Sequence, residues 1–268
     1  MESEKVPVVE AIDLTVGYGD TIIQRNLNFT VSEGEVFAIL GGSGCGKSTL
    51  LKHLIGLYQP LAGDIKLFGE SIVNTTEDRR REIMRRFGVT YQGGALFGSL
   101  TLAENVALPL EEYTSLSKKE IKEVVQEKLS LVHLDGFDDY LPSEISGGMK
   151  KRAGLARALA LDAKLLFFDE PSAGLDPISS ADLDRLILSL RDKIDATIVI
   201  VTHELDSIFS IADRVIMLDK KEKSIVASGN PEELRRSSTN SWVREFLNRT
   251  GMKRHADEDE KEREEAVL

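Results

Sequence analysis

The sequence is poor in cysteine and in long apolar runs. Cys45 is the only cysteine among 268 residues, so no intrachain disulfide can form and a reducing cytoplasm is the expected compartment. No apolar run approaches the roughly 20 residues that a membrane-spanning helix requires. The first residues, MESEKVP, contain no apolar signal segment. We therefore expect the chain to reach a membrane only through a partner.

The sequence also lacks an excess of basic residues. Its 34 lysines and arginines stand against 45 aspartates and glutamates, which gives a net charge of −11. Sequence-independent binding to DNA or RNA depends on a basic face, so this balance argues against nucleic acid as a partner. The hydrophobic content of 41 % is sufficient for one large domain, or for two lobes around a shared sheet.

A phosphate-binding loop is the most informative stretch that is present. The apolar run 36–40 is too short for a helix and predicts a buried strand. The next eight residues match the pattern G-x-x-x-x-G-K-[ST], in which loop amides cradle phosphates, the lysine reaches the β- and γ-phosphates and the hydroxyl ligates Mg²⁺. The residues predicted to bind nucleotide here are Gly41, Gly42, Ser43, Gly44, Cys45, Gly46, Lys47, Ser48 and Thr49. The alternative is a flexible glycine loop before a helix; Cys45 itself fits a small filler residue better than a redox sensor.

An exposed aromatic residue precedes this loop. Residues 8–16 and 20–31 favour two strands, with Gly17-Tyr18-Gly19 as their turn. Tyr18 could stack on adenine, or could simply be a turn residue.

Polar residues follow three further apolar segments. Gln92 follows a short strand at 88–91, Asp169-Glu170 follows the run 164–168, and His203 follows the strand 197–202. Mg²⁺ prefers oxygen ligands, so Asp169 and the Gln92 amide are candidates for the metal. Glu170 is the candidate general base and His203 the candidate contact to the γ-phosphate. For His203, a purely structural role stays open.

Residues 95–163 have a helical pattern that interrupts the strands. Helices are expected at 101–110, 117–131 and 147–161, the second with a capping box formed by Ser117 and Glu120. Ser146-Gly147-Gly148 at the start of the third helix resembles a second phosphate site, unless it is an ordinary N-cap. Because one nucleotide does not need two such sites, this one is expected to serve a nucleotide that another subunit holds.

The C-terminal region divides into two parts. Residues 241–250 are expected to form an amphipathic helix whose apolar residues are Trp242, Val243, Phe246 and Leu247. This face could pack on its own domain or dock on a partner subunit. Residues 251–268 are charged and are expected to be disordered.

Taken together, the motifs resemble the nucleotide-binding subunit of an ABC transporter over residues 8–247. They stand in the family's order: the phosphate loop, Gln92 of the Q-loop, Ser146-Gly147-Gly148-Met149 of the signature, Asp169-Glu170, Asp176 of the D-loop and His203 of the switch. The resemblance implies an α/β P-loop NTPase domain over 8–240, with a RecA-like core, an N-terminal antiparallel β edge and a helical signature subdomain at 95–163. It also implies a homodimer around two Mg-ATP, with each signature capping the other subunit's nucleotide.

A narrower resemblance is to the ATPases of Mce-type bacterial phospholipid transport, the Mla group. The stretches YQGGALFGSLTLAENVALPL, PSEISGGMKKRAGLARALAL and THELDSIFSIADRVIMLD carry it. Met149 stands where many ABC proteins have glutamine, and methionine is usual in this group. The resemblance implies an integral-membrane, MlaE-like permease and an Mce-domain lipid-binding protein as partners, at the cytoplasmic face of the inner membrane.

Two other functions compete with transport. A soluble ABC-type switch acting on nucleic acid or ribosomes usually has two ATPase domains or a long coiled-coil insertion, and the chain has one set of motifs and is acidic. A module that binds ATP without hydrolysis would not need Glu170 and His203.

Overall fold

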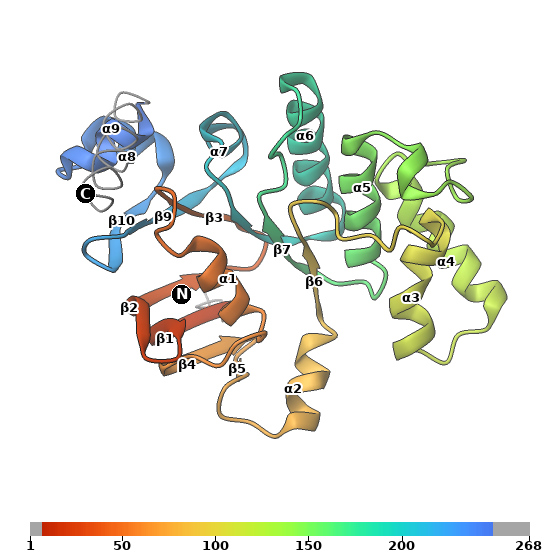
Figure 1. Cartoon of the computed structure of the whole chain (residues 1–268), viewed down its shortest axis with the longest axis horizontal. Helices are drawn as coiled ribbons and strands as arrows, with labels where there is room; N and C mark the ends of the chain where they lie inside the picture. The colour runs from red at the N-terminus through yellow and green to blue at the C-terminus, as the bar shows by residue number, and fades with distance from the viewer. Residues whose placement is uncertain (1–6, 249–268) are drawn as a thin grey trace, which may run out of the picture.

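A computed structural model describes residues 7–248, in which two sheets enclose one helix and a group of helices extends to one side (Figure 1). The larger sheet has the order β10-β9-β3-β8-β7-β6. Its strands are β3 (Val36–Gly41), β6 (Phe87–Thr90), β7 (Leu165–Asp169), β8 (Thr197–Val201), β9 (Arg214–Asp219) and β10 (Ser224–Gly229). All neighbours pair in parallel except β10 with β9.

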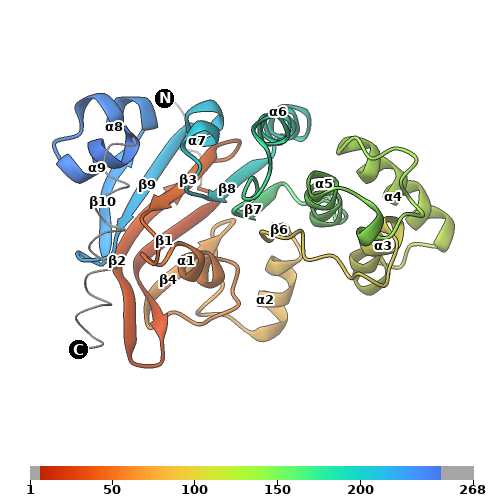
Figure 2. The same ribbon diagram turned by 45° about the horizontal axis from the view of Figure 1, so that its top comes forward.

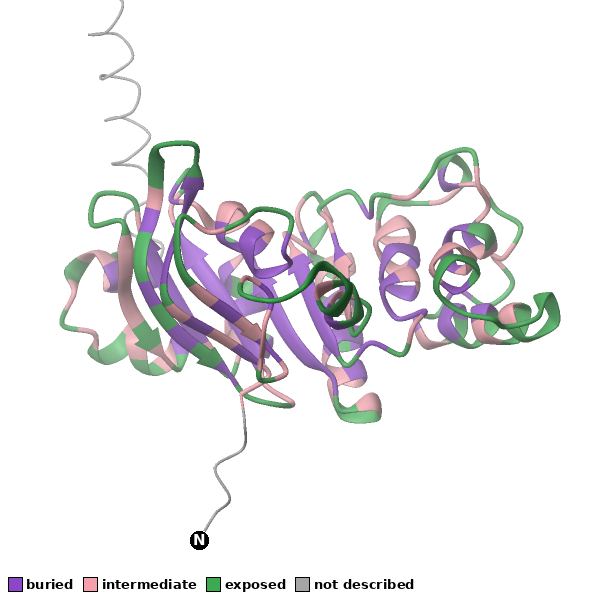
Figure 3. Ribbon diagram, turned by 90° about the horizontal axis from the view of Figure 1, so that it is seen from below, coloured by how far each residue is buried: buried purple, intermediate pink, exposed green. Residues whose placement is uncertain are grey.

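The central strands are apolar because both faces of the sheet are covered. Every residue of β3 and of β8 is buried, as parallel strands with helices on both faces require. In Figure 3 the buried colour runs along these strands, while exposed residues gather on loops and outer helix faces. The predicted α/β fold with a P-loop core is therefore confirmed.

The smaller sheet is antiparallel and lies at the N-terminal end, in the order β2-β1-β4-β5. Its strands are β1 (Val9–Tyr18), β2 (Thr21–Val31), β4 (Ala62–Leu67) and β5 (Glu70–Ser71). The turn differs from the expected one: Gly17 and Tyr18 end β1, and Gly19-Asp20 form the turn. The β1–β2 ladder continues to the end of the hairpin, because Gly17 pairs with Ile22 and Tyr18 pairs with Thr21.

Helix α1 (Lys47–Leu54) lies between the two sheets (Figure 2). Its Leu50, Leu51 and Leu54 are fully buried in an apolar cluster that includes residues of β1, β3 and β7. This packing fixes the start of α1, and with it the preceding glycine loop, against the end of β3.

The helical region between β6 and β7 contains α3 (Leu102–Tyr113), α4 (Lys118–Leu131), the 3₁₀ turn η1 (Pro142–Glu144) and α5 (Gly147–Ala158). Thr101 and Ser117 begin α3 and α4 with reciprocal capping boxes, the second of which was predicted. Helix α5 packs on β6 so closely that a Cβ on Gly88 would lie 2.2 Å from the Ala158 carbonyl oxygen. Backbone contact of this kind attaches the helical region firmly to the sheet.

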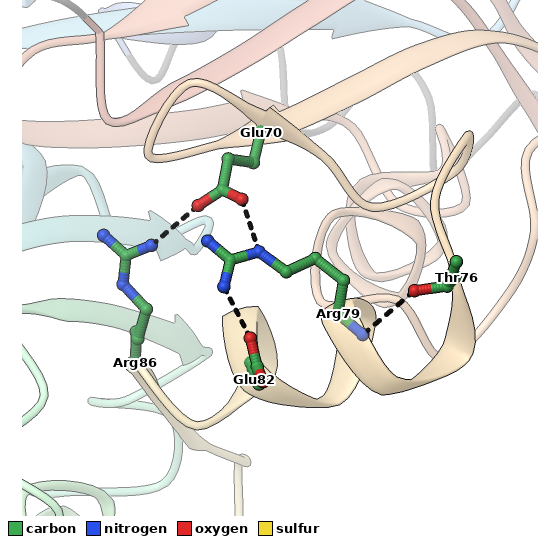
Figure 4. A network of polar contacts seen from close by, with 5 residues as sticks. All are labelled: Glu70, Thr76, Arg79, Glu82 and Arg86. Carbon is green, nitrogen blue, oxygen red and sulfur yellow. Dashed lines mark hydrogen bonds and ion pairs between the residues drawn. The ribbon is translucent and has the colours of Figure 1, made fainter.

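Helix α2 (Glu77–Met84) is rich in arginine, but its charges are largely paired. Arg79 contacts Glu70 at 2.7 Å and Glu82 at 2.5 Å, and Arg86 contacts Glu70 at 3.2 Å (Figure 4). Thr76 caps the helix through the Arg79 amide. These pairs fasten α2 to β5.

The remaining helices are α6 (Pro177–Ile194), α7 (Leu205–Ile211), α8 (Pro231–Ser237) and α9 (Ser241–Leu247). In α9, Val243 and Leu247 are buried against Leu205 and Met217, so the apolar face packs on its own domain. The last two residues of the helix predicted at 241–250, and the segment 251–268 that was expected to be disordered, lie outside the described residues. Among residues 7–248, no helix combines the length and apolar character needed to cross a membrane.

Candidate nucleotide site

The candidate residues gather at one edge of the large sheet because parallel strands end together. Asp169 of β7 pairs with Val201 of β8, and Val201 pairs with Ile39 of β3. The glycine loop, the pair Asp169-Glu170 and His203 therefore follow neighbouring strands at the same edge. Gln92 follows β6, the next strand beyond β7, and its exposed side chain makes no hydrogen bond to another described residue.

The glycine loop adopts a conformation that other residues could not. Gly44 and Gly46 have φ of 71° and 101°, and a Cβ on Gly41 would lie 2.5 Å from both the Cys45 sulfur and the Leu218 carbonyl oxygen. Gly46 provides no side-chain cap for α1, and the first turn of α1 contains no acidic residue. The first amides of α1 and the positive end of its dipole are thus available to an anion.

Lys47, Ser48 and Asp169 form the polar centre of the site. The Lys47 ammonium donates to the carbonyl oxygens of Gly41 at 2.9 Å and Gly42 at 3.3 Å. The Ser48 hydroxyl donates to Asp169 Oδ1 at 3.2 Å. Burial raises the pKa of the Asp169 carboxyl group, while the Ser48 hydrogen bond opposes that rise.

Glu170 has a left-handed backbone conformation, and only one of its two carboxylate oxygens has a hydrogen-bond partner among the described residues. Its φ is 50°, in the left-handed region, and its amide donates to the Val201 carbonyl oxygen at 2.8 Å. His203 Nδ1 lies 2.9 Å from Glu170 Oε1, whereas Oε2 is buried with no hydrogen-bond partner among the described residues. A buried oxygen of this kind is suited to accept a proton or hydrogen bond from a bound molecule.

Tyr18 lies beside the start of α1. Its hydroxyl group is 3.3 Å from Thr49 Oγ1, and its ring packs edge-on against Tyr58 with centroids 5.3 Å apart. The Tyr18 residue is 43 % exposed, so an aromatic surface is available next to the phosphate loop.

The signature residues begin α5 and are separate from the phosphate loop of the same chain. Ser146 is the N-cap of α5, and its hydroxyl oxygen accepts from the Met149 amide at 3.3 Å. Ser146 and Gly147 are exposed, while the Met149 side chain packs against the apolar core of the helical region. In both ribbon views α5 and α1 lie on opposite sides of β6 (Figures 1 and 2).

Asp176 has a local structural task in this chain. It is the N-cap of α6, and its carboxylate accepts from the Ile178 and Ser179 amides, each at 3.0 Å, and from the Ser179 hydroxyl group. These hydrogen bonds lower the pKa of the Asp176 carboxyl group.

A family model described as "ABC transporter" matches residues 24–173, more than half of the chain. The chain belongs to the ABC transporter family. The matched segment contains the phosphate loop, Gln92, the signature and Asp169-Glu170.

Several named relatives of this ABC subunit match over nearly the whole chain. The "Probable ribonucleotide transport ATP-binding protein mkl" of Mycobacterium tuberculosis is 43 % identical over 97 % of this chain and 73 % of its own length. The "Intermembrane phospholipid transport system ATP-binding protein MlaF" is 40 % identical in Haemophilus influenzae, over 86 % of both chains. In Escherichia coli it is 39 % identical, over 92 % of this chain and 91 % of that one.

Solved ABC structures agree with this fold. A dimeric bacterial ABC transporter cassette has a TM-score of 0.74 at 28 % identity, over 83 % of this chain and 98 % of that one. A cassette titled as a post-hydrolysis state with ADP and Pi gives 0.73 at 28 %, with the same coverage. Together with the ATP-binding relatives, these likenesses identify this ABC subunit as an ATPase, as the motifs predicted.

The donor atoms of this ABC site fit a magnesium ion. Residues 7–248 contain no group of three or more His, Cys, Asp or Glu that could hold a metal by themselves. Mg²⁺ does not require one, because it is usually held by one or two protein oxygens together with phosphates and water. Ser48 and Asp169, joined at 3.2 Å, supply two such oxygens.

One supporting residue of this ABC site escaped the sequence analysis. Gln24 on β2 is fully buried, and its amide donates to the carbonyl oxygens of Cys45 at 2.7 Å and Asp219 at 3.0 Å. It holds the phosphate loop against the end of β9. Cys45 is itself buried, and burial raises the pKa of its thiol, which agrees with a packing role.

Proposed function

We propose that this ATPase works as a homodimer in which each phosphate loop meets the signature of the other copy. The observation that supports this most directly is the separation of α1 and α5 within one chain, with Ser146 and Gly147 exposed. Both elements offer helix N-termini that suit phosphate, yet they lie apart. A second copy, related by two-fold symmetry, can bring them together twice.

Within the composite site, each residue has a role that follows from its atoms. The glycine-loop amides and Lys47 bind the phosphates, Tyr18 stacks on the adenine, and Ser48 and Asp169 hold Mg²⁺, with Gln92 as a further oxygen donor. The metal, when bound, neutralises charge on the phosphates. Most of the rate comes from positioning and charge stabilisation by these groups.

Glu170 acts as the general base of ATP hydrolysis. Its Oε2 has no hydrogen-bond partner among the described residues and is the oxygen assigned to accept the proton of the attacking water, while Oε1 lies 2.9 Å from His203 Nδ1. His203 thus orients the carboxylate and can present its other ring nitrogen to the γ-phosphate.

The transported molecule is a phospholipid, and the partners are an MlaE-like permease and an Mce-domain protein at the cytoplasmic face of the bacterial inner membrane. Support comes from the MlaF relatives, which align over 86 % and 91 % of their own lengths, against 73 % for mkl and 54 % for the glycine betaine protein OpuAA of Bacillus subtilis. The methionine at position 149 is in line with this assignment.

A mixing experiment tests the composite site. Lys47→Ala removes the phosphate-binding ammonium, and Ser146→Arg blocks the exposed signature with a bulky side chain. Neither variant alone should hydrolyse ATP, but a heterodimer of the two has one intact site. An equal mixture should regain about a quarter of wild-type turnover, since half of the dimers are mixed and half of their sites are whole. No recovery, with both variants folded and dimeric, would refute the shared site.

Purification from membranes tests the transport assignment. The tagged chain, isolated in mild detergent, should bring a permease and bound phospholipid, both identified by mass spectrometry. Ribosomes or RNA instead of a permease would favour a soluble switch, and a permease carrying ribonucleotide would correct the substrate.

A further inference from the structure

Lys151 connects the signature helix to the loop that follows Glu170. It lies in the second turn of α5, and its ammonium donates to the carbonyl oxygens of Pro171 and Ala173, both at 2.6 Å. These short bonds use two of the three donors of the ammonium group. They link the helical region to the sheet edge at the position immediately after the proposed base.

The partly buried surroundings of Lys151 strengthen these hydrogen bonds. The side chain is half-buried beside Tyr91 and Phe168, and burial lowers the pKa of its ammonium group, with the Glu170 carboxylate opposing this effect. A charge-assisted hydrogen bond in a partly dry environment is stronger than one in water. The neighbouring Lys150 makes no side-chain hydrogen bond to another described residue and provides a matched control.

The loop that Lys151 holds needs external support. Glu170 has a φ of 50°, a conformation that costs free energy for a non-glycine residue. The turn is closed by one long hydrogen bond, from the Ala173 amide to the Glu170 carbonyl oxygen at 3.3 Å. Such a conformation persists only where surrounding contacts fix it. On the helical side, the two bonds from Lys151 are contacts of this kind.

We infer that Lys151 is a positioning residue for hydrolysis, which holds the Glu170 carboxylate in its reactive orientation and makes that orientation depend on the placement of the signature helix. The inference rests on the proposed function of Glu170 as base. When a partner's nucleotide engages Ser146 at the start of α5, it contacts the same helix whose Lys151 already holds the loop behind Glu170. Signature engagement and activation of the base are thereby joined by one side chain.

Lys151→Met tests this role, because methionine retains an unbranched side chain but cannot donate. We expect turnover at saturating ATP to fall by about 10- to 100-fold, the range expected for a displaced catalytic group. The dissociation constant of a fluorescent ATP analogue should stay within about twofold of wild type, since the phosphate loop is untouched. Lys151→Arg, which can reach two carbonyl groups, should recover part of the loss, and Lys150→Met should behave as wild type.

The outcomes separate the inference from the proposed function. Equal turnover of Lys151→Met and Lys150→Met, or parallel loss of turnover, nucleotide binding and thermal stability, would overturn the positioning role alone. Absence of ATP hydrolysis by the wild-type chain in its transporter complex would overturn the proposed function and this inference with it.

A double-mutant comparison locates the effect. If Lys151 acts through Glu170, adding Lys151→Met to Glu170→Gln should change the residual turnover by less than about twofold, because the carboxylate it positions is already gone. A further drop equal to that of the single Lys151→Met variant would show that the lysine acts elsewhere and would overturn the inference.

Discussion

Helix α9 is the part of the fold whose packing most needs a quantitative test. Leu247 is 2 % exposed and Val243 is fully buried, in a cluster with residues of β9 and α7. Leu247→Ala removes three carbon atoms from this cluster, which at about 0.8 kcal/mol each corresponds to about 2.4 kcal/mol of lost burial. Leucine-to-alanine changes in cores cost about 2–5 kcal/mol. Because α9 is a short helix that can shift inward, we expect about 2–3 kcal/mol.

For a chain of this size, where about 1 kcal/mol corresponds to about 2 °C, that loss should lower Tm by roughly 4–6 °C in a circular-dichroism melt. Ser241→Ala, an exposed change on the same helix, is the control and should stay within about 1–2 °C of wild type. If Leu247→Ala had the same Tm as the control, the packing of α9 on its own domain would be refuted. Docking on a partner subunit would then be the better explanation of its apolar face.

Three further predictions concern binding, pH and packing. Lys47→Ala should bind ATP at least about tenfold more weakly in a titration, because charge-assisted bonds to phosphate are lost; unchanged affinity would contradict the site. Burial raises the pKa of the Asp184 carboxyl group on α6 above its ordinary 3.8. Its stabilising contribution is therefore fully present below pH 3.8 and is lost as the pH rises through the raised pKa. Melts from about pH 4 to 8 should show wild type losing stability relative to Asp184→Asn, and a constant difference between the two would argue against the shift. Gly88→Ala should cost at least about 1–3 kcal/mol in denaturant unfolding, since its Cβ would collide with the Ala158 carbonyl group, and an unchanged midpoint would mean that α5 is less closely packed on β6.

The sequence predicted the elements whose signals are local. Alternation and apolar runs located the strands, and Ser117 with Glu120 located the start of α4. Helix α6 begins at Pro177, because Asp176 is its N-cap and proline suits the first turn. That signal was present in the sequence and was assigned to the D-loop alone.

What could not be predicted depends on contacts between distant segments. Gln24 supports the phosphate loop through Cys45 and Asp219, which are 21 and 195 positions away. Lys151 holds a loop about 20 residues further along the chain, although its neighbour Lys150 looks identical in sequence. The same holds for the pairing of His203 with Glu170 across 33 positions. Motif spacing identified Glu170 and His203 but not their pairing, and only the fold reveals the roles of Gln24 and Lys151.

Phosphate release by the wild-type chain and by Glu170→Gln tests the central claim most directly. The claim is that this ABC subunit hydrolyses ATP with Glu170 as base, inside a dimer that ATP closes. We predict that Glu170→Gln lowers turnover by about 10²- to 10⁴-fold yet forms a dimer with ATP, visible by light scattering after size exclusion. Turnover of Glu170→Gln at the wild-type rate would contradict the account.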